Sequence, residues 1–370
     1  MYITFYTKAS TKQVTFEELL NNPYMTLDSI KETSHKRITT ECTDEYGLRL
    51  YNKNNTNHNL YEAILTPFNE LAETIDTSEH YRHFEIPKKN SNKTRPIDAP
   101  DDTISPLQNV YKDYIEKKLH VLSHKAAHAY VEKRSTITAM QEHQKNNSKW
   151  FLQIDLKNFF NSINEEFLRK MLLEVYPFKF IPENTLNGII KSALLNGSLP
   201  QGSHLSPTLT NIIMVPIDHI ITEKLHNYNK HHYVYTRYAD DITISSKEKF
   251  NWREIKGIIE EIFNEWNVPF YINEEKTRFG SSAGRNYHVG LIINKDNQIS
   301  VGHEKNNKFK AMIFNFCTTG NEWEIKDVQK MLGLISYYKS IEPDFIEKTI
   351  TKYNTKFNIN IMEKAKELIK

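Results

Sequence analysis

The fold of this chain is decided by the stretch Tyr238-Ala239-Asp240-Asp241. It joins two segments rich in Tyr, Val, Thr and Ile, a pattern that predicts a β-hairpin over residues 232–246. Neighbouring side chains of a strand point to opposite faces, so Asp240 and Asp241 can converge only in a tight turn. Two carboxylates held together repel each other unless a cation such as a divalent metal ion neutralises them. A surface hairpin with two turn aspartates is the alternative interpretation.

A third acid, Asp155, ends another apolar segment that begins at Trp150 and alternates like a strand. Alone, Asp155 could simply cap the next turn. With the hairpin it completes three carboxylates at strand ends, which suit two Mg²⁺ ions about 4 Å apart that catalyse phosphoryl transfer. One ion would lower the pKa of a primer 3′-hydroxyl, and the other would hold a triphosphate. The expected catalytic residues are Asp155, Asp240 and Asp241, and the expected metal ligands are these three with Leu156.

The surrounding sequence predicts an alternation of helices and strands. The pattern from residue 150 to residue 294 indicates strand–helix–helix–hairpin–helix–strand, which is an α+β fold with helices on one face of an antiparallel sheet. Loops are expected over 52–59 and 88–94. Strands are expected over 81–87, 95–100, 150–155 and 289–294. Helices are expected from Leu107, from an N-cap at Asn164, from Ser206 with a kink at Pro216, over 251–266, and through most of the chain after Val301.

Bulk composition is that of a globular protein. The 370 residues suggest two or three compact units, and the net charge of +2 is only weakly basic. Two cysteines in unrelated contexts, Cys42 and Cys317, suggest neither a disulfide framework nor a zinc site, so a reducing cytoplasm is expected. The N-terminus lacks a signal-peptide pattern, and no apolar run is long enough to span a bilayer. Basic residues cluster over 88–95 and 112–134, which could be solvated faces or nucleic-acid contacts.

Several motifs resemble those of reverse transcriptases, in the same order along the chain. Tyr238 to Asp241 resembles the Y-x-D-D signature, and Asp155 with Phe159-Phe160 resembles the first catalytic motif. The block Leu199-Pro200-Gln201-Gly202-Ser203-His204-Leu205-Ser206-Pro207-Thr208-Leu209-Thr210-Asn211 is similar to P-Q-G-x-x-x-S-P-x-L-x-N of bacterial enzymes. Arg95 to Pro100 resembles their fingers motif, and Asn273-Glu274-Glu275-Lys276-Thr277 their lysine-bearing motif. The resemblance covers about residues 81–294.

The resemblance implies an RNA-directed DNA polymerase with a right-hand fold of fingers, palm and helical thumb. The implied boundaries are 1–60 for an N-terminal extension, 61–150 for fingers, 151–295 for palm and 296–370 for thumb. An RNase H or endonuclease domain is not expected. The implied partners are dNTPs, an RNA template and the DNA product, with two Mg²⁺ ions and no membrane.

The resemblance also assigns roles to individual residues. Phe160 matches the aromatic steric gate, whose ring would collide with a ribose 2′-oxygen; a core aromatic is the alternative. Arg95 with Lys88 or Lys89 would bind the triphosphate, and Gln201-Gly202 would let backbone approach nucleotide and template. Lys276 is a candidate general acid, with a surface lysine as the alternative. The candidate nucleic-acid contacts are Lys117, Lys118, Lys125, Lys133 and Arg134.

Within the family, the resemblance is to retron and other bacterial defence-associated enzymes. The segment Thr138 to His143 resembles the retron N-A-x-x-H element with threonine in place of asparagine, and His288-Val289-Gly290 stands where retron enzymes carry V-T-G. Both elements are linked to recognising the structured RNA. Both elements depart from the retron pattern, so we expect a retron-like enzyme of another defence type that acts against phage together with a noncoding RNA. Whether it also works with a neighbouring effector protein or as an oligomer stays open. The alternatives are template-independent or protein-primed synthesis, another palm enzyme, and a non-catalytic RNA-binding scaffold.

Overall fold

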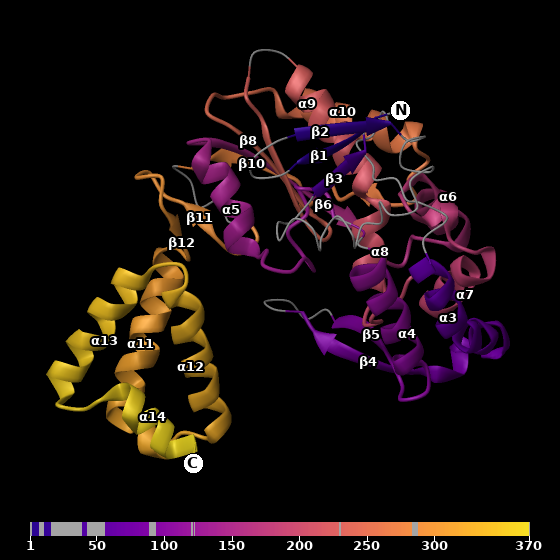
Figure 1. Cartoon of the computed structure of the whole chain (residues 1–370). Coiled ribbons are helices and arrows are strands. Elements are labelled where there is room, and N and C mark those ends of the chain that lie inside the picture. Colours follow the sequence, from indigo (N-terminus) through magenta and orange to yellow (C-terminus); the bar gives the residue numbers. More distant parts are fainter. Residues whose placement is uncertain are drawn as a thin grey trace. The chain divides into compact units, whose positions relative to one another are not determined.

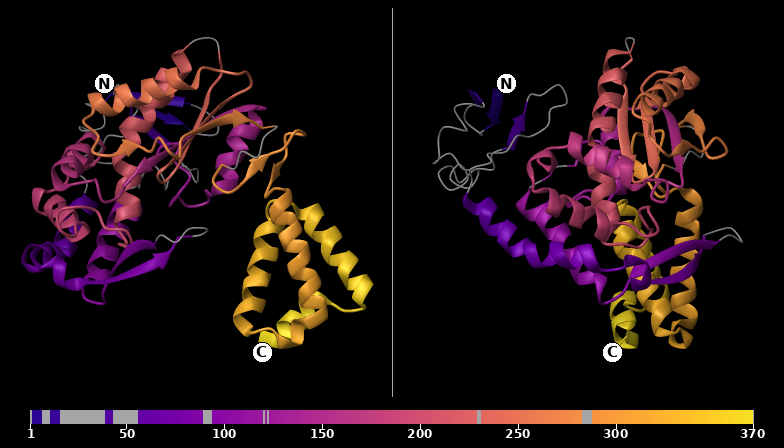
Figure 2. Two further views of the ribbon diagram at one scale, coloured as in Figure 1. Left: turned by 180° about the vertical axis from the view of Figure 1, so that it is seen from behind. Right: turned by 90° about the vertical axis from the view of Figure 1, so that its right-hand side faces the viewer.

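The computed structural model (Figures 1 and 2) describes most of the chain, which divides into two compact units. The described residues are 2–6, 11–15, 39–42, 56–88, 94–119, 121, 123–228, 231–282 and 288–369. The first unit comprises Met1–Val131, Asp155–Asn229 and Arg253–Glu275, and the second comprises Glu132–Ile154, Lys230–Trp252 and Lys276–Lys370. Each unit is therefore assembled from segments that are far apart in the sequence.

The N-terminal part contains a small antiparallel sheet in the order β2-β1-β3. Its strands are β1 (Tyr2–Tyr6), β2 (Thr11–Thr15) and β3 (Thr39–Cys42). Helix α3 (Thr56–Thr74) follows. The prediction of a loop over residues 52–59 was wrong from Thr56 onward; the stretch before it lies outside the described residues. The polar residues there form the first turn of a helix, because apolar residues at helical spacing follow, among them the buried Leu65 and Ala72.

The described part of the first unit contains several helices. They are α4 (Ile104–Asp113), the π-type turn η2 (Tyr114–Lys118), α6 (Glu165–Glu174), α7 (Glu183–Ala193), α8 (Ser206–Ile213), α9 (Val215–Asn227) and α10 (Trp252–Glu265), with short 3₁₀ turns η1 (Thr77–His80) and η3 (Phe178–Phe180). The predicted cap of α6 is confirmed, because Asn164 Oδ1 accepts from Phe167 N at 2.9 Å. The break between α8 and α9 falls at Met214, just before Pro216, as proline sterics require.

Helix α7 was missed, and the helix predicted from Ser206 is divided into α8 and α9, so four helices rather than two separate the predicted strand from the hairpin. It is an amphipathic helix whose buried side chains include Leu186, Ile189 and Ile190. It packs beside α3 and α4, and a buried hydrogen bond of 3.0 Å joins Asn69 Nδ2 to Thr185 Oγ1. A glycine in its middle, Gly188, leaves room for the Tyr111 ring, which explains why a residue of low helix propensity lies there.

The two predicted strands on either side of residue 90 pair as a hairpin; of the turn predicted over 88–94, residues 89–93 lie outside the described residues. Strands β4 (Tyr81–Pro87) and β5 (Thr94–Pro100) are antiparallel, with Tyr81 opposite Pro100 and Pro87 opposite Thr94. Apart from Tyr81, the side chains of β4 are exposed. The described part of this hairpin is thus anchored at its base rather than along its length.

The main sheet is antiparallel and has the strand order β10-β6-β8-β7, with β9 paired to β6. The strands are β6 (Trp150–Lys157), β7 (Val234–Tyr238), β8 (Asp241–Ser246), β9 (Tyr271–Ile272) and β10 (Arg278–Ser281). The predicted hairpin and the predicted strand from Trp150 are confirmed, although β6 continues two residues past the predicted end at Asp155, to Lys157. In the second unit, α5 (Thr136–Lys145) packs on this sheet beside β7.

The C-terminal part of the second unit is helical, as predicted. Figure 1 shows α11 (His303–Thr319), α12 (Ile325–Lys339), α13 (Pro343–Phe357) and α14 (Ile361–Ile369) packed together, with a 3₁₀ turn η4 (Gly320–Glu322). One apolar core runs from Met140 of α5 and Phe151 of β6 through Phe309 and Met331 to Ala365. The four helices are thereby fixed to α5 and to the start of β6.

The predicted strand over residues 289–294 is mostly wrong. Only Ile292–Ile293 form a strand, β11, which pairs with β12 (Ile299–Ser300). Val289 and Gly290 have φ values of 45° and 84°, so the chain turns there, and His288 pairs with Leu291 across the turn. In the described part of the chain, no helix is long and apolar enough to cross a membrane.

Candidate active site

The tip of the β7–β8 hairpin carries Asp240 and Asp241. Tyr238 pairs with Asp241, and Ala239 reverses the chain with a left-handed φ of 56°. The guanidinium of Arg237 is fully buried and donates from Nη1 to the Ala239 carbonyl at 3.2 Å. Both aspartates are half-buried. The two adjacent aspartates therefore lie on a tight turn, as the sequence predicted, and the buried Arg237 side chain stabilises this turn.

Asp155 lies near the end of β6 and is 8% exposed. Asn273 fixes it twice: the Asn273 backbone N donates to the Asp155 carbonyl at 2.8 Å, and Asn273 Nδ2 donates to Asp155 Oδ2 at 3.0 Å. The next residue, Leu156, is buried and pairs with Ile272 of β9. Sequence reasoning placed Asn273 in a family motif but missed this role, because the two residues are 118 positions apart.

The donor types around these elements suit magnesium, which prefers carboxylate and carbonyl oxygens. Asp155 belongs to the first unit, whereas Asp240 and Asp241 belong to the second. Among the described residues, no three His, Cys, Asp or Glu side chains are gathered as a metal cluster. The fit to the metal is thus one of ligand chemistry, and the common site of the three aspartates stays a prediction.

Phe160 is half-buried and packs against two aromatic rings. Its ring centroid is 5.5 Å from that of Phe159 and 6.4 Å from that of Tyr130, both edge to face. Tyr130 is 55% exposed and has a left-handed φ of 57°, which is uncommon for a bulky residue. Its loop is held by Asn211, whose Nδ2 donates to the Ala129 carbonyl at 2.7 Å. Tyr130 was not singled out from the sequence, since its conformation leaves no sequence signal.

The Gln201-Gly202 loop is built against the β4–β5 hairpin. Asp98 N donates to the Gln201 carbonyl at 2.8 Å, and Gly202 has a φ of 123°. A Cβ atom on Gly202 would lie 2.7 Å from the Asp98 carbonyl oxygen, which no L-side chain could tolerate. The sequence predicted that this glycine lets backbone approach a nucleotide; the neighbour that the structure shows is strand β5.

Gln108 on α4 joins this loop to the rest of the first unit. It is fully buried, and its Nε2 donates to Tyr81 Oη at 2.7 Å and to the Ser192 carbonyl at 2.8 Å. Its Oε1 accepts from Ser203 Oγ at 3.1 Å and from the His204 backbone N at 3.2 Å. One side chain thereby ties β4, α7 and the loop together. The sequence gave no sign of this role, because its partners lie at positions 81, 192, 203 and 204.

The predicted cationic residues are on the surface. Lys88 and Arg95 are exposed on the β4–β5 hairpin, Lys276 is exposed after β9, and Lys89 lies outside the described residues. Of the five candidate nucleic-acid contacts, Lys117 pairs with Asp113 at 2.8 Å and Lys133 with Glu132 at 3.5 Å. Lys118 and Lys125 are exposed, and burial lowers the pKa of the Arg134 guanidinium from its ordinary value. Lys117, Lys118 and Lys125 belong to the first unit, and Lys133 and Arg134 belong to the second.

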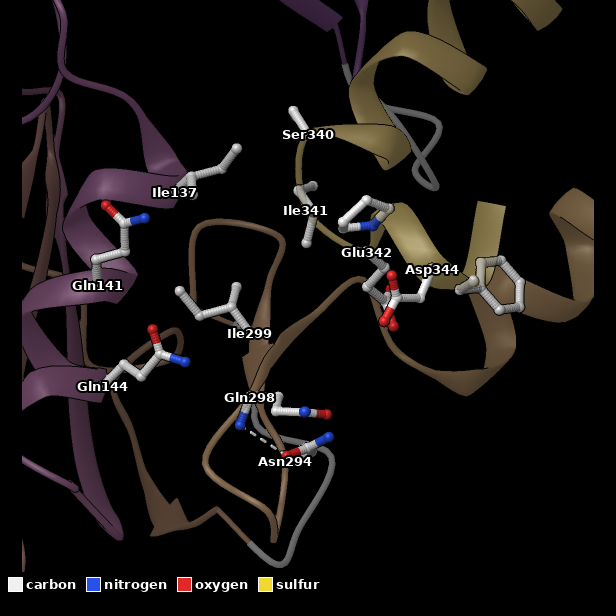
Figure 3. Close-up of a pocket in the computed structure, with 12 residues that line it drawn as sticks. Ile137, Gln141, Gln144, Asn294, Gln298, Ile299, Ser340, Ile341, Glu342 and Asp344 are labelled. Carbon is white, nitrogen blue, oxygen red and sulfur yellow. Dashed lines mark hydrogen bonds between the residues drawn. The ribbon is translucent and has the colours of Figure 1, made fainter. Parts of the chain in front are cut away.

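A cavity of about 390 Å³ in the second unit contains none of the predicted site residues (Figure 3). It lies between α5, the β11–β12 turn and the segment joining α12 to α13. Amide and apolar side chains dominate its wall. Glu342, one of its two acids, accepts from Ser300 Oγ and from Val301 N, each at 3.0 Å. Glu342 therefore connects the segment between α12 and α13 to the end of β12.

Sequence comparison identifies the class of protein. The chain matches the family described as reverse transcriptase (RNA-dependent DNA polymerase) over residues 86–316, and it belongs to that family. It is thus an RNA-directed DNA polymerase, and the predicted fold class, an α+β right-hand polymerase fold, is confirmed. The exact boundaries of fingers, palm and thumb stay a prediction.

The curated relatives include retron enzymes. The retron Ec83 reverse transcriptase of Escherichia coli is 28% identical over 291 residues, covering 74% of this chain and 87% of its own. The retron Ec73 reverse transcriptase of the same organism is also 28% identical, covering 76% and 90%. A truncated apo telomerase from Candida tropicalis is 13% identical with a TM-score of 0.41; the match covers 64% of this chain and 59% of that one. The telomerase likeness is too distant to bear on the fold, whereas the predicted retron-like character is confirmed.

Proposed function

We propose that this reverse transcriptase copies a noncoding RNA into DNA with two metal ions bound by Asp155, Asp240 and Asp241. The direction of the strands carries the proposal. At the start of β6, Lys149 N donates to the carbonyl of Ser246, the last residue of β8, at 2.9 Å. Neighbouring strands joined this way run antiparallel, so the end of β6 is directed toward the start of β8. Asp155 and Asp241 stand at those two ends.

The chain's own residues would bind and orient the reactants. Asp155, with the Leu156 carbonyl, and the hairpin aspartates would hold two magnesium ions, which supply positive charge to the attacking 3′-oxygen and to the departing pyrophosphate. Asn273 would keep the Asp155 carboxylate in a fixed orientation, because it donates hydrogen bonds to Asp155 Oδ2 and to the backbone carbonyl of Asp155. Arg237 would keep the turn rigid. Preorganised ligands of this kind spare the enzyme the cost of reorganising during reaction.

Deoxynucleotide selection is assigned to Phe160 and triphosphate binding to Arg95 and Lys88. Phe160 is supported from the side by Tyr130 and Phe159, which would keep its ring from yielding to a ribose 2′-hydroxyl. Arg95 and Lys88 are exposed on β4–β5, where a triphosphate can reach them. Lys276 would protonate pyrophosphate, and Lys117, Lys118, Lys125, Lys133 and Arg134 would contact nucleic-acid phosphates.

The biological setting is proposed from the retron relatives. The chain spans 87% and 90% of the two retron enzymes described above. We assign it a cognate noncoding RNA as template and a role in antiphage defence.

The test is DNA synthesis by the purified protein with its copurifying RNA, magnesium and four dNTPs. We expect DNA complementary to that RNA, and loss of about 10³-fold or more of the rate in Asp240→Asn, because several kcal/mol of metal-mediated stabilisation disappear. The exposed Asp296→Asn is the matched control and should keep the wild-type rate. DNA made equally well after removal of the RNA by ribonuclease would contradict templated synthesis. Phage plating on cells with the native locus, with and without Asp240→Asn, tests the defence role.

A further inference from the structure

Helix α5 covers the sheet of the second unit with a face that contains a histidine. The helix begins with a capping box in which Ser135 and Thr138 exchange side-chain and backbone hydrogen bonds. Its buried residues are Ala139, Met140 and His143. Two of these are apolar, as expected for a helix packed on a sheet. His143 is the polar member and is 0% exposed.

Both ring nitrogens of His143 contact hydroxyl groups of the β7–β8 hairpin. Nδ1 lies 2.6 Å from Ser245 Oγ on β8, and Nε2 lies 2.8 Å from Thr236 Oγ1 on β7. A neutral imidazole has one donor and one acceptor nitrogen, and hydroxyls can act as either, so both contacts can be hydrogen bonds. Removal of either partner would leave a polar atom buried without compensation. The ring therefore fixes both strands to the helix at once.

The histidine belongs to a longer buried network that begins in the loop before β6. Ser245 Oγ donates to Ser148 Oγ at 2.7 Å, and Ser148 N donates to the His143 carbonyl at 3.1 Å. Ser148, Thr236 and Ser245 are each no more than 3% exposed. Helix α5, the segment entering β6 and both strands of the hairpin thus share one set of hydrogen bonds.

The contact points lie on the strand face that leads to the aspartates. Asp241, Thr243 and Ser245 occupy alternate positions of β8, and Thr236 pairs with Thr243, so all four share one face of the hairpin. Thr236 is two residues from Tyr238, the partner of Asp241. A strand rises about 3.4 Å per residue, so the Thr236 position that bonds to the imidazole is roughly 7 Å along β7 from Tyr238, which pairs with Asp241 at the hairpin tip. A small displacement of the hairpin at Thr236 and Ser245 would therefore also move the carboxylates of Asp240 and Asp241.

The surroundings of His143 leave no access for RNA. Its ring lies 5.7 Å from that of Phe151, and the Phe151 ring also lies 4.6 Å from the ring of His288. Phe151 is 1% exposed and His288 is 3% exposed. His143 and His288 are the histidines of the two elements that the resemblance to retron enzymes linked to RNA recognition. In this structure both are part of the interior of the second unit.

We propose that His143 is a positioning residue for catalysis: through Thr236 and Ser245 it sets the placement of the hairpin that carries Asp240 and Asp241. The inference rests on the proposed function, because it assumes that this hairpin carries the catalytic metal ligands. It assigns to His143 an effect on the chemical step and none on RNA binding.

The test measures steady-state dTTP incorporation on poly(rA) primed with oligo(dT), which requires no cognate RNA, together with the amount of RNA that copurifies. For His143→Leu we expect kcat to fall about 10- to 100-fold, with KM for dTTP changed less than about threefold, because misplacement by an ångström costs that much. Copurifying RNA should be unchanged. His143→Gln, which can still bond one hydroxyl, should recover part of kcat.

Milder variants cover the case in which His143→Leu fails to fold. Thr236→Val and Ser245→Ala each remove one partner and should each lower kcat, with less than additive effects when either is combined with His143→Gln. Thr349→Val is the matched control, since it removes a buried hydroxyl bonded to Phe345 in α13; it should lower the melting temperature without lowering kcat.

Two results would overturn the proposal. One is a His143→Leu or Thr236→Val enzyme with wild-type kcat on poly(rA) and reduced copurifying RNA, which would restore a role in RNA recognition. The other is a kcat that falls only in proportion to the loss of melting temperature, as it would for a merely structural residue. Asp240→Asn in the same assay separates the proposals, because an active Asp240→Asn enzyme would refute the proposed metal site itself.

Discussion

The two hairpins of this polymerase differ in how they are held. In β7–β8, which bears Asp240 and Asp241, most strand residues are buried, and Thr236, Arg237 and Ser245 form hydrogen bonds inside. In β4–β5, which bears Arg95, most side chains are exposed and the attachments shown are at the base and at Asp98. Metal ligands need fixed geometry, whereas cations that meet a triphosphate need access. Substitutions in the first hairpin should therefore affect stability and rate together, and those in the second should affect substrate affinity alone.

The largest effect on stability is expected at Arg237. Arg237→Met removes a fully buried guanidinium and leaves the Ala239 carbonyl without this donor. We expect a loss of about 3 kcal/mol or more in the free energy of unfolding, because buried polar groups deprived of a partner cost that much. Urea unfolding measures it. The exposed Lys247→Met, just after β8, is the control and should change stability by less than about 0.5 kcal/mol. Equal stability of the two variants would remove the contrast between the hairpins.

A smaller effect, confined to substrate binding, is expected at Arg95. Arg95→Ala should raise KM for dNTPs about 10- to 100-fold, because hydrogen bonds to charged groups contribute about 1.5–3 kcal/mol. Its melting temperature should stay at the wild-type value, since the side chain is exposed. Arg82→Ala, exposed on the other strand of the same hairpin, serves as the control and should leave KM unaltered. A large drop in melting temperature for Arg95→Ala would show that this hairpin too is held by its side chains.

These contrasts indicate what the sequence could and could not predict. Local signals were sufficient for the hairpin at Asp240, for the strand that carries Asp155 and for the Asn164 cap, because alternation and capping depend on near neighbours. They failed at Val289–Gly290, where a left-handed turn interrupts an apolar run, and at α7, whose pattern was overlooked. Contacts such as Asn273 with Asp155 join residues 118 positions apart, and no periodicity encodes them.

The smallest expected effect is a pH dependence from His288, whose ring lies 4.6 Å from that of Phe151. Burial lowers the pKa of His288 from 6.5 to about 4. As the pH falls below 6.5, His288 takes up a proton in the unfolded chain but stays neutral in the folded chain. The free energy of unfolding therefore has its full value above pH 6.5 and decreases as the pH drops toward 4. At pH 5.5 the loss is about 1 kcal/mol.

His288→Phe should remove this part of the acid sensitivity, and thermal melting at pH 7.5 and 5.5 measures the difference from wild type. His303→Phe changes an exposed histidine and is the control. If His288→Phe keeps the wild-type difference between the two pH values, the buried neutral imidazole is not the source.

The most direct test of the proposed metal site is cleavage of the backbone by bound iron. Fe²⁺ replaces Mg²⁺ in the purified protein, and ascorbate with peroxide generates hydroxyl radicals at the bound ion. Fragments from cuts near Asp155 and near Asp240 should both form, both should disappear with excess Mg²⁺, and both should be lost in Asp240→Asn. Cuts at one segment only, or cuts near Asp155 that survive in Asp240→Asn, would contradict a metal site common to the two strands.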